Sequence, residues 1–169
     1  MHIDTRTGPT WPDPHSVGVR AWGALLRAHT AVVPRLDREL HAAVGISLSW
    51  YDVLLELMNA PGRRLQMSEL GERVTVSRTR VSRLVDEMER AGLIERQAHP
   101  SDRRSTYAAI TALGRRQFRA AAPVYLRGIY EHFIASLKPG EIAAIAAGLQ
   151  RVADTAQVRA AEPAPAGRR

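Results

Sequence analysis

Apolar residues recur along most of the chain at the i, i+3, i+4 spacing that one buried face of an α-helix requires. The first such run begins at Val17 and ends at Gly45, with Pro34 inside it. We expect Pro34 to kink this helix or split it in two, because proline has no amide hydrogen to donate within a helix. A second run covers residues 47–59, where a serine can cap its start and Ala60-Pro61-Gly62 stops it.

The period of the pattern changes in the middle of the chain. A short helix is predicted over residues 68–74 and a longer one over residues 77–91, with Gly92 as its C-terminal cap. Two short strands then follow, 93–97 and 105–110, joined by a charged, turn-rich connection. Two long helices complete the pattern, one from 112 to 136 with a bend at Pro123 and one from 139 to 160.

Three helices followed by a two-stranded hairpin is the element order of a winged helix-turn-helix. We therefore predict a mainly α fold with a small β-hairpin wing. The terminal helices carry apolar stripes that either form a dimer interface or fold back onto the monomer core, and we favour the dimer. The expected organisation is a flexible arm, a dimerisation helix, a DNA-binding lobe, C-terminal dimerisation helices and a disordered tail, over residues 1–16, 17–46, 47–111, 112–160 and 161–169.

Charge is distributed unevenly along this pattern. The chain has a net charge of +7, and a net of +5 falls between Arg63 and Arg116, where 12 arginines face 7 acidic residues. A concentrated block of arginine is typical of a face that binds the phosphates of a nucleic acid. An anionic membrane surface is the weaker alternative. No apolar run approaches the length needed to span a bilayer.

The helix predicted over residues 77–91 has one apolar and one polar face. Its apolar stripe points inward with that of the short helix before it, which leaves hydroxyls and arginines outward at its start. Arginine bonds guanine in a bidentate manner, and serine or threonine reaches phosphates or base edges. A solvated helix face is the alternative for any single arginine. The candidate major-groove residues are Ser77, Arg78, Thr79, Arg80, Ser82 and Arg83.

The predicted hairpin tip carries Asp102, Arg103 and Arg104. Two guanidinium groups on a projecting loop suit the narrow, electronegative minor groove. Asp102 would repel phosphate if it were unpaired, so we expect it to hold an arginine in position. An ordinary charged turn is the alternative for this segment taken by itself.

These segments resemble the MarR family of bacterial transcription regulators (multiple-antibiotic-resistance type). The resemblance covers about residues 17–155 and is most specific at Pro100-Ser101-Asp102-Arg103-Arg104 followed by Thr111-Ala112-Leu113-Gly114. It implies a homodimer of intertwined terminal helices, a recognition helix at 77–91 in the major groove and a wing at 96–105 in the minor groove. It also implies regulation by small, often phenolic or aromatic ligands bound between the dimer helices and the DNA-binding lobe.

A ligand site is suggested by the few large polarisable side chains, which gather in the first two predicted helices. Aromatic bodies with polar tips are suited to a phenol or a planar organic anion, whose carboxylate Arg27 or Arg96 would balance. Plain core packing and a structural histidine are the alternative. The candidates are Trp22, His29, Trp50, Tyr51 and Met58.

Other functions find little support. The chain has no cysteine, and its six histidines do not show metal-ligand spacing. It also lacks a glycine-rich phosphate loop and a Gly-x-Ser-x-Gly nucleophile motif. We therefore expect no enzymatic activity, no catalytic residue, no metal and no cofactor. Without a signal-peptide core, a cytoplasmic location is expected.

The sequence thus predicts a homodimeric regulator of double-stranded DNA bearing an inverted repeat, acting as a repressor that an aromatic or phenolic effector releases. A transcriptional activator and a ligand-independent or architectural DNA-binding protein remain open. A protein-interaction adaptor is disfavoured, because arginines are present on both the recognition helix and the wing.

Overall fold

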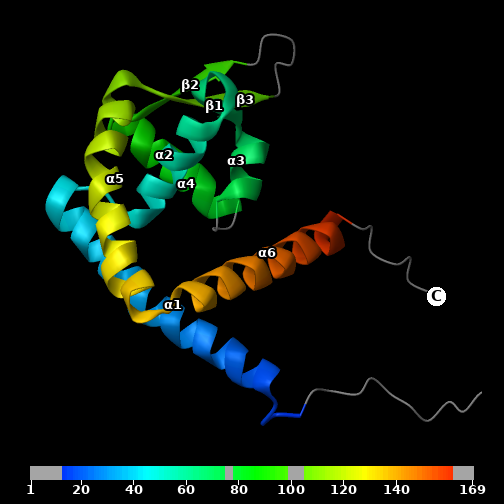
Figure 1. Cartoon of the computed structure of the whole chain (residues 1–169). Coiled ribbons are helices and arrows are strands. Elements are labelled where there is room, and N and C mark those ends of the chain that lie inside the picture. The colour runs from blue at the N-terminus through cyan, green and yellow to red at the C-terminus, as the bar shows by residue number, and fades with distance from the viewer. Residues whose placement is uncertain (1–12, 75–77, 99–104, 162–169) are drawn as a thin grey trace, which may run out of the picture. The chain divides into compact units, whose positions relative to one another are not determined.

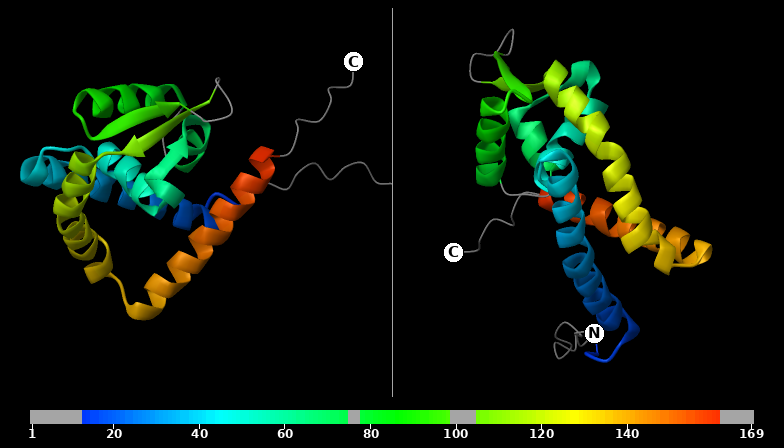
Figure 2. Two further views of the ribbon diagram at one scale, coloured as in Figure 1. Left: turned by 90° about the horizontal axis from the view of Figure 1, so that it is seen from above. Right: turned by 90° about the vertical axis from the view of Figure 1, so that its left-hand side faces the viewer.

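The computed structural model describes residues 13–74, 78–98 and 105–161. The chain divides within its fifth α-helix into two compact units, residues 1–128 and 129–169. Figures 1 and 2 show the elements. In chain order these are α1 (Val17–Val44), α2 (Leu48–Asn59), η1 (Pro61–Arg63), β1 (Arg64–Gln66), α3 (Met67–Arg73), α4 (Arg78–Arg90), β2 (Ile94–Ala98), β3 (Thr106–Ile110), α5 (Ala112–His132), η2 (Ile134–Ser136) and α6 (Pro139–Ala161).

Helix α1 runs without interruption through Pro34. Of the two outcomes expected at this proline, a split into two helices is therefore wrong. Proline removes one amide donor, which would otherwise bond to the carbonyl of Thr30 four residues earlier. Beyond Pro34, Leu36 and Leu40 are buried, and this packing holds the second half of the helix in place. The helix ends as predicted at Gly45, whose φ of 73° lies in the left-handed region that favours glycine.

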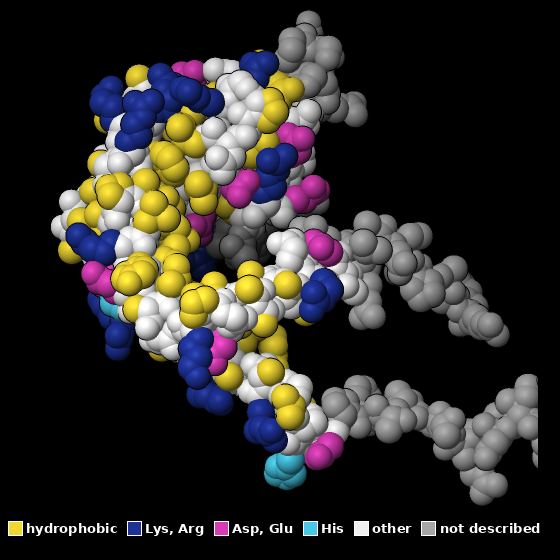
Figure 3. Space-filling model, viewed as in Figure 1, with side chains coloured by type: hydrophobic (Ala, Val, Ile, Leu, Met, Phe, Trp, Pro, Cys, Tyr) yellow, Lys and Arg dark blue, Asp and Glu magenta, His cyan; other side chains and the backbone are white. Residues whose placement is uncertain are grey.

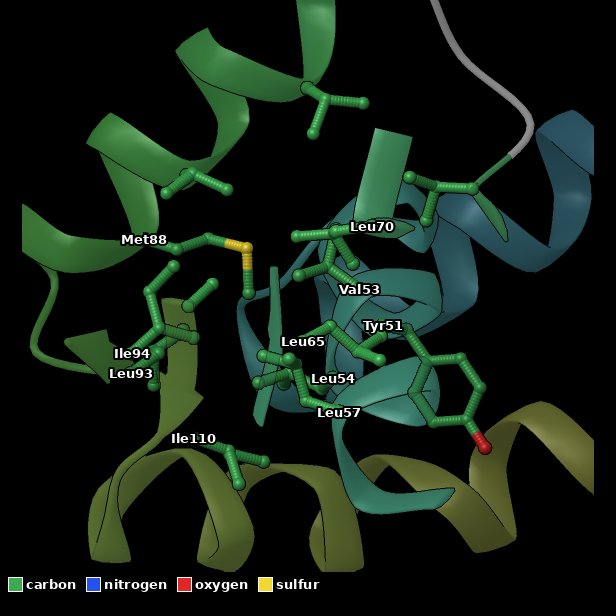
Figure 4. Close-up of a cluster of buried hydrophobic side chains, with 14 of the residues drawn as sticks. Tyr51, Val53, Leu54, Leu57, Leu65, Leu70, Met88, Leu93, Ile94 and Ile110 are labelled. Atoms are coloured by element: carbon green, nitrogen blue, oxygen red, sulfur yellow. The ribbon is translucent and has the colours of Figure 1, made fainter. Parts of the chain in front are cut away.

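Helices α2, α3 and α4 share one hydrophobic core with the sheet, as Figure 4 shows for part of it. The inward residues of α2 are Val53, Leu54 and Leu57, all fully buried. Full burial of such a side chain contributes about 1.5–3 kcal/mol. Ser47 caps α2, because its hydroxyl accepts the amide of Trp50 at 3.2 Å. These contacts confirm the mainly α fold with a small wing that the sequence predicted.

The sheet has three strands in the order β1-β3-β2, all antiparallel, where the sequence predicted two. The additional strand β1 pairs Leu65 with Ala108 of β3. The sequence did not predict β1, because this strand is only three residues long and buries one side chain. An alternating apolar pattern cannot be recognised over so short a segment. Strand β2 pairs with the opposite edge of β3, with Arg96 across from Ala108.

The junction between the sheet and α5 explains why threonine and glycine stand three residues apart in this segment. The Thr111 hydroxyl donates to the carbonyl of Gly92 at 2.7 Å and accepts the amide of Gly114 at 3.0 Å. A Cβ atom at Gly114 would lie 2.1 Å from the carbonyl oxygen of Leu93, which is closer than any real contact. Only glycine therefore fits here, and α5 begins against the segment that joins α4 to β2.

Helix α5 is continuous through Pro123 and ends at His132, four residues before the predicted end. The segment that follows tightens into the 3-10 turn η2. In the second unit, α6 begins at Pro139, and the side chain of Glu141 accepts the amide of Lys138 at 2.8 Å. This helix matches the prediction to within one residue.

Candidate nucleic-acid interface and adjoining cleft

Helix α4 has the two faces that the sequence predicted. Val81, Val85 and Met88 are fully buried, and Leu84 is nearly so. On the solvent side, Arg80, Ser82 and Arg83 are exposed. This burial fixes the rotation of the helix about its axis, so these side chains are directed away from the protein core.

The other predicted DNA-contact residues lie at the limits of the described structure. Arg78 and Thr79 form the first turn of α4, but their side chains are not among those described. Ser77 lies outside the described residues, as do Asp102, Arg103 and Arg104. Their roles therefore remain predictions. The strands β2 and β3 lead directly to the hairpin connection that contains the last three.

Arg96 on β2 fastens the wing to α4. Its guanidinium bonds the Asp86 carboxylate at 2.6 Å and also bonds Glu89, whose other carboxylate oxygen accepts the Arg96 amide at 3.1 Å. Burial lowers the pKa of Arg96, but the hydrogen bonds that its guanidinium donates to Asp86 and Glu89 outweigh burial and raise the pKa above its usual value. The suggested role of Arg96 as countercharge to a ligand is therefore not supported, because two carboxylates already occupy it.

Some of the described arginines between residues 63 and 116 have structural roles. Arg64 of β1 lies over the ring of Tyr107 at 4.7 Å and donates to Gln97 at 3.2 Å, so it braces the sheet. Arg115 donates to the carbonyl of Ile110 at 3.2 Å at the start of α5. Figure 3 shows basic side chains gathered toward the end of the molecule where α5 begins. The concentration of charge in the sequence thus includes arginines with structural roles as well as those of α4.

A cleft of about 800 Å³ lies beside α4, within the first unit. Its walls come from α1, α2, the end of α3, α4 and α5. His29 and Arg80 line it from α1 and α4, and Tyr125 lines it from α5. The volume lies within the range of sites for drug-sized molecules.

Of the five predicted ligand residues, only His29 lines this cleft. Trp22 is 60% exposed on α1, whereas Trp50 and Met58 pack partly buried against the core. Tyr51 is buried, with its ring centroid 5.3 Å from that of Phe118 and 4.5 Å from that of Tyr125. Within the described residues these five side chains do not surround a single cavity.

The tyrosines beside the cleft are held in their neutral form. Burial, followed by the influence of Tyr125 and of Asp52, raises the pKa of Tyr51 to about 12. The pKa of Tyr125 is also raised, by burial first and by Asp52 second. Tyr125 and Asp52 were missed by the sequence analysis. Tyr125 lies 74 positions beyond the ring on which it packs, and no short spacing signals such a contact.

Three carboxylates line the cleft, and their surroundings differ. Asp37 accepts the amide of Leu48 at 2.7 Å, at the start of α2. Glu56 lies 3.9 Å from the guanidinium of Arg73. Burial and the neighbouring Glu56 carboxylate raise the pKa of the third, Asp52.

Apolar side chains are also exposed along the first half of α1. The large ones are Val17, Val19, Trp22, Leu25 and Leu26. Hydrophobic side chains are visible along this end of α1 in Figure 3. Isolated exposed leucines are common, but five large apolar residues within ten positions form a patch typical of a protein interface.

No group of three or more histidine, cysteine or acidic side chains is placed to hold a metal ion in the part of the chain that the structure describes. None of the described helices is both long enough and apolar enough to cross a membrane.

Helices α2, α3 and α4 with the three-stranded sheet define a winged helix-turn-helix protein. Residues 44–105 match a sequence model described as the MarR family. The crystal structure of Sco3205, a MarR family transcriptional regulator from Streptomyces coelicolor in complex with DNA, is similar over 88% of this chain and 91% of that one. The identity is 28% and the TM-score 0.80. The chain is thus similar to MarR family regulators in the sequence of this segment and in fold.

Curated relatives are similar over a shorter span. The HTH-type transcriptional regulator PrsX of Escherichia coli is 30% identical over 95 residues, which are 54% of this chain and 57% of that protein. The transcriptional repressor MprA of Escherichia coli K12 is 33% identical over 81 residues, covering 48% of this chain and 46% of MprA. The match thus spans about half the length of each of these relatives. Both names describe regulators of transcription.

Proposed function

We propose that this protein is a homodimeric, sequence-specific regulator of transcription that binds double-stranded DNA and acts as a repressor. The exposed face of α4 carries the proposal. It presents Arg80, Ser82 and Arg83 on a helix whose opposite side is locked into the core. Side chains in fixed positions on one helix can read base edges in the major groove.

The wing adds a second contact in this proposal. Arg103 and Arg104 enter the minor groove beside the recognition helix, with Asp102 positioning one of them. Ser77, Arg78 and Thr79 complete the contact at the start of α4. The Arg96 bridge to Asp86 and Glu89 supports this arrangement, because it joins strand β2 of the wing to α4.

Dimerisation follows from the exposed apolar patch on α1. Trp22, Leu25 and Leu26 are too apolar to be left in water without cost, and a second copy of the chain offers the same patch. Two recognition helices related by a two-fold axis then bind an inverted repeat, with half-sites about one helical turn apart or a multiple of it.

Regulation by a small aromatic or phenolic molecule is assigned in this proposal to the cleft beside α4. Its walls include both α1, the proposed dimer helix, and Arg80 of the proposed recognition helix. A ligand would weaken DNA binding if it bound more tightly to an arrangement of α1 and α4 that does not fit the operator. His29 is the predicted residue best placed for this role.

Mobility shifts on DNA selected from the genome test the proposal. Replacing Arg80 or Arg83 by alanine should each weaken binding by about 1–3 kcal/mol, because each removes a base contact. Arg127→Ala is the matched control, since Arg127 is an exposed arginine of α5 outside the proposed interface.

Three results would contradict the proposal. The first is equal loss in Arg127→Ala, which would indicate general attraction to charge. The second is an unchanged affinity in both α4 variants. The third is a stable monomer in sedimentation that binds DNA as tightly as the dimer.

A further inference from the structure

The cleft beside α4 combines apolar walls with acidic polar groups. Its apolar walls are formed by Val33 and Leu36 of α1, Leu48 and Leu55 of α2, and Val74. Asp37, Asp52 and Glu56 line it too, against two arginines, Arg73 and Arg80. A purely structural crevice would not be expected to keep carboxylates among apolar side chains, because removing their charge from water costs free energy.

Asp52 is the carboxylate without a counterion. Asp37 is satisfied by the amide of Leu48, and Glu56 has Arg73 beside it. Asp52 makes no hydrogen bond or ion pair with another residue that the structure describes. Its charged neighbour is Glu56, one helical turn further along α2, which bears the same charge and disfavours ionisation. Burial and Glu56 are the two influences on the pKa of Asp52, and neither Arg73 nor Arg80 offsets them.

An aromatic ring that lines the cleft with this carboxylate is also suited to a cation. Tyr125 lines the cleft, and the pKa of Tyr125 is raised partly by Asp52, so ring and carboxylate interact. Its phenol remains neutral at physiological pH. A cation attracted to a carboxylate and to the face of a neighbouring ring gains from both when water is excluded.

We propose that this cleft binds an organic cation, a protonated or quaternary amine on a flat apolar body, with Asp52 as its counterion. The assignment of the cleft to an effector rests on the proposed function. What is added here is that the effector is positively charged. An aromatic acid, expected from the sequence, would find Arg80 in the cleft for its carboxylate but would also meet the charge of Asp52. The occupant also shares the cleft with Arg80, so its binding depends on where α4 holds that arginine.

Three tricyclic probes of one shape and different charge test the proposal. They are 10-methylacridinium, acridine and acridine-9-carboxylate, which are cationic, neutral and anionic at neutral pH. Each is titrated into the full chain without DNA, since the cation also intercalates, and binding is followed by calorimetry and probe fluorescence. We expect the cation to bind about tenfold more tightly than the neutral probe or better, and the anion most weakly. Equal or tighter binding of the anion would overturn the proposal, as would no binding of the cation.

A pair of isosteric variants locates the binding. Asp52→Asn should weaken the cation about tenfold or more and leave the neutral probe within about twofold of its original affinity. Glu131→Gln is the matched control, because it removes one exposed carboxylate outside the cleft and should change neither probe. Equal loss in both variants would mean general attraction to charge, and an unchanged affinity in Asp52→Asn would mean another site. Either result refutes the assignment. Thermal unfolding confirms that both variants are folded.

Operator binding without any probe separates this inference from the proposed function. A protein that shifts its operator but does not bind the cation retains the function and refutes the inference. A protein that binds the cation through Asp52 but shows no sequence-selective DNA binding refutes the function and retains the site.

Discussion

The outer face of α4 and the cleft beside it handle charge in opposite ways. On α4, Arg80 and Arg83 are exposed, and the core residues behind them fix the rotation of the helix. In the cleft, Asp52 is partly buried, lacks a described counterion and stands next to another carboxylate. The first arrangement suits a long polyanion approaching from outside, and the second suits a small cation that enters the protein.

The two regions also differ in what they cost the fold. Exposed arginines on a helix are close to neutral for stability. A partly desolvated carboxylate beside a like charge lowers the stability of the fold. Charge that is retained at a cost to stability is a better indicator of a binding site than charge that costs nothing.

The largest expected effect comes from Gly114, which supports both regions. Gly114→Ala brings a Cβ atom against the backbone carbonyl of Leu93, and no flexible side chain can yield. We expect a loss of about 3 kcal/mol in the free energy of unfolding. The midpoint of thermal unfolding, followed by circular dichroism, should fall by about 10 °C. Gly140→Ala is the control, since a Cβ there meets nothing within 4 Å. A variant at Gly114 as stable as the native chain would refute the close packing of α5 on Leu93.

On the DNA-binding side, Arg96 holds the wing against α4. Arg96→Ala releases strand β2 from α4 and leaves Asp86 and Glu89 facing each other without a cation. Operator affinity should drop about five- to tenfold, evenly across related sequences, because the wing loses its position while the base-reading residues stay. Arg96→Lys should recover only part of the loss, since lysine cannot bridge two carboxylates in the planar manner of arginine. A change in base preference would contradict this positioning role.

The smallest expected effect is at Asp52 and concerns stability. The pKa of Asp52 is higher in the folded protein than in an unfolded chain, where it is 3.8. The folded state therefore gains from this group at pH values below 3.8 and loses that gain as the pH rises through the folded value. Asp52→Asn should be slightly more stable than the native chain at neutral pH, and the difference should vanish near pH 4. A native chain that is more stable than Asp52→Asn at neutral pH would indicate a counterion at this carboxylate.

The sequence predicted the elements that depend on repetition. The helices and the hairpin strands follow from apolar spacing, and the caps at Ser47, Gly45 and Gly92 follow from local chemistry. The orientation of α4 was predictable too, because its buried positions repeat at helical spacing over 13 residues. The short strand β1 was not, since a single buried leucine makes no pattern.

The features that depend on distant parts of the chain could not be predicted. The sequence suggested Arg96 as the countercharge for a ligand carboxylate. Its partners in the structure, Glu89 and Asp86, lie 7 and 10 residues earlier on another element. Tyr51 looked like a ligand residue, but its ring packs on Phe118 and Tyr125, which belong to a helix that starts 61 positions later. The charge of the cleft depends on which acidic residues find a partner, and sequence spacing does not reveal this.

The claim that α4 reads DNA sequence is tested most directly by selecting sites from randomised DNA with the native protein and with Arg83→Ala. The account predicts an inverted repeat for the native chain. It also predicts loss of preference at one base pair in each half-site for the variant, with the rest of the site unchanged. An identical base preference in both proteins, or no enriched repeat with the native chain, would contradict it.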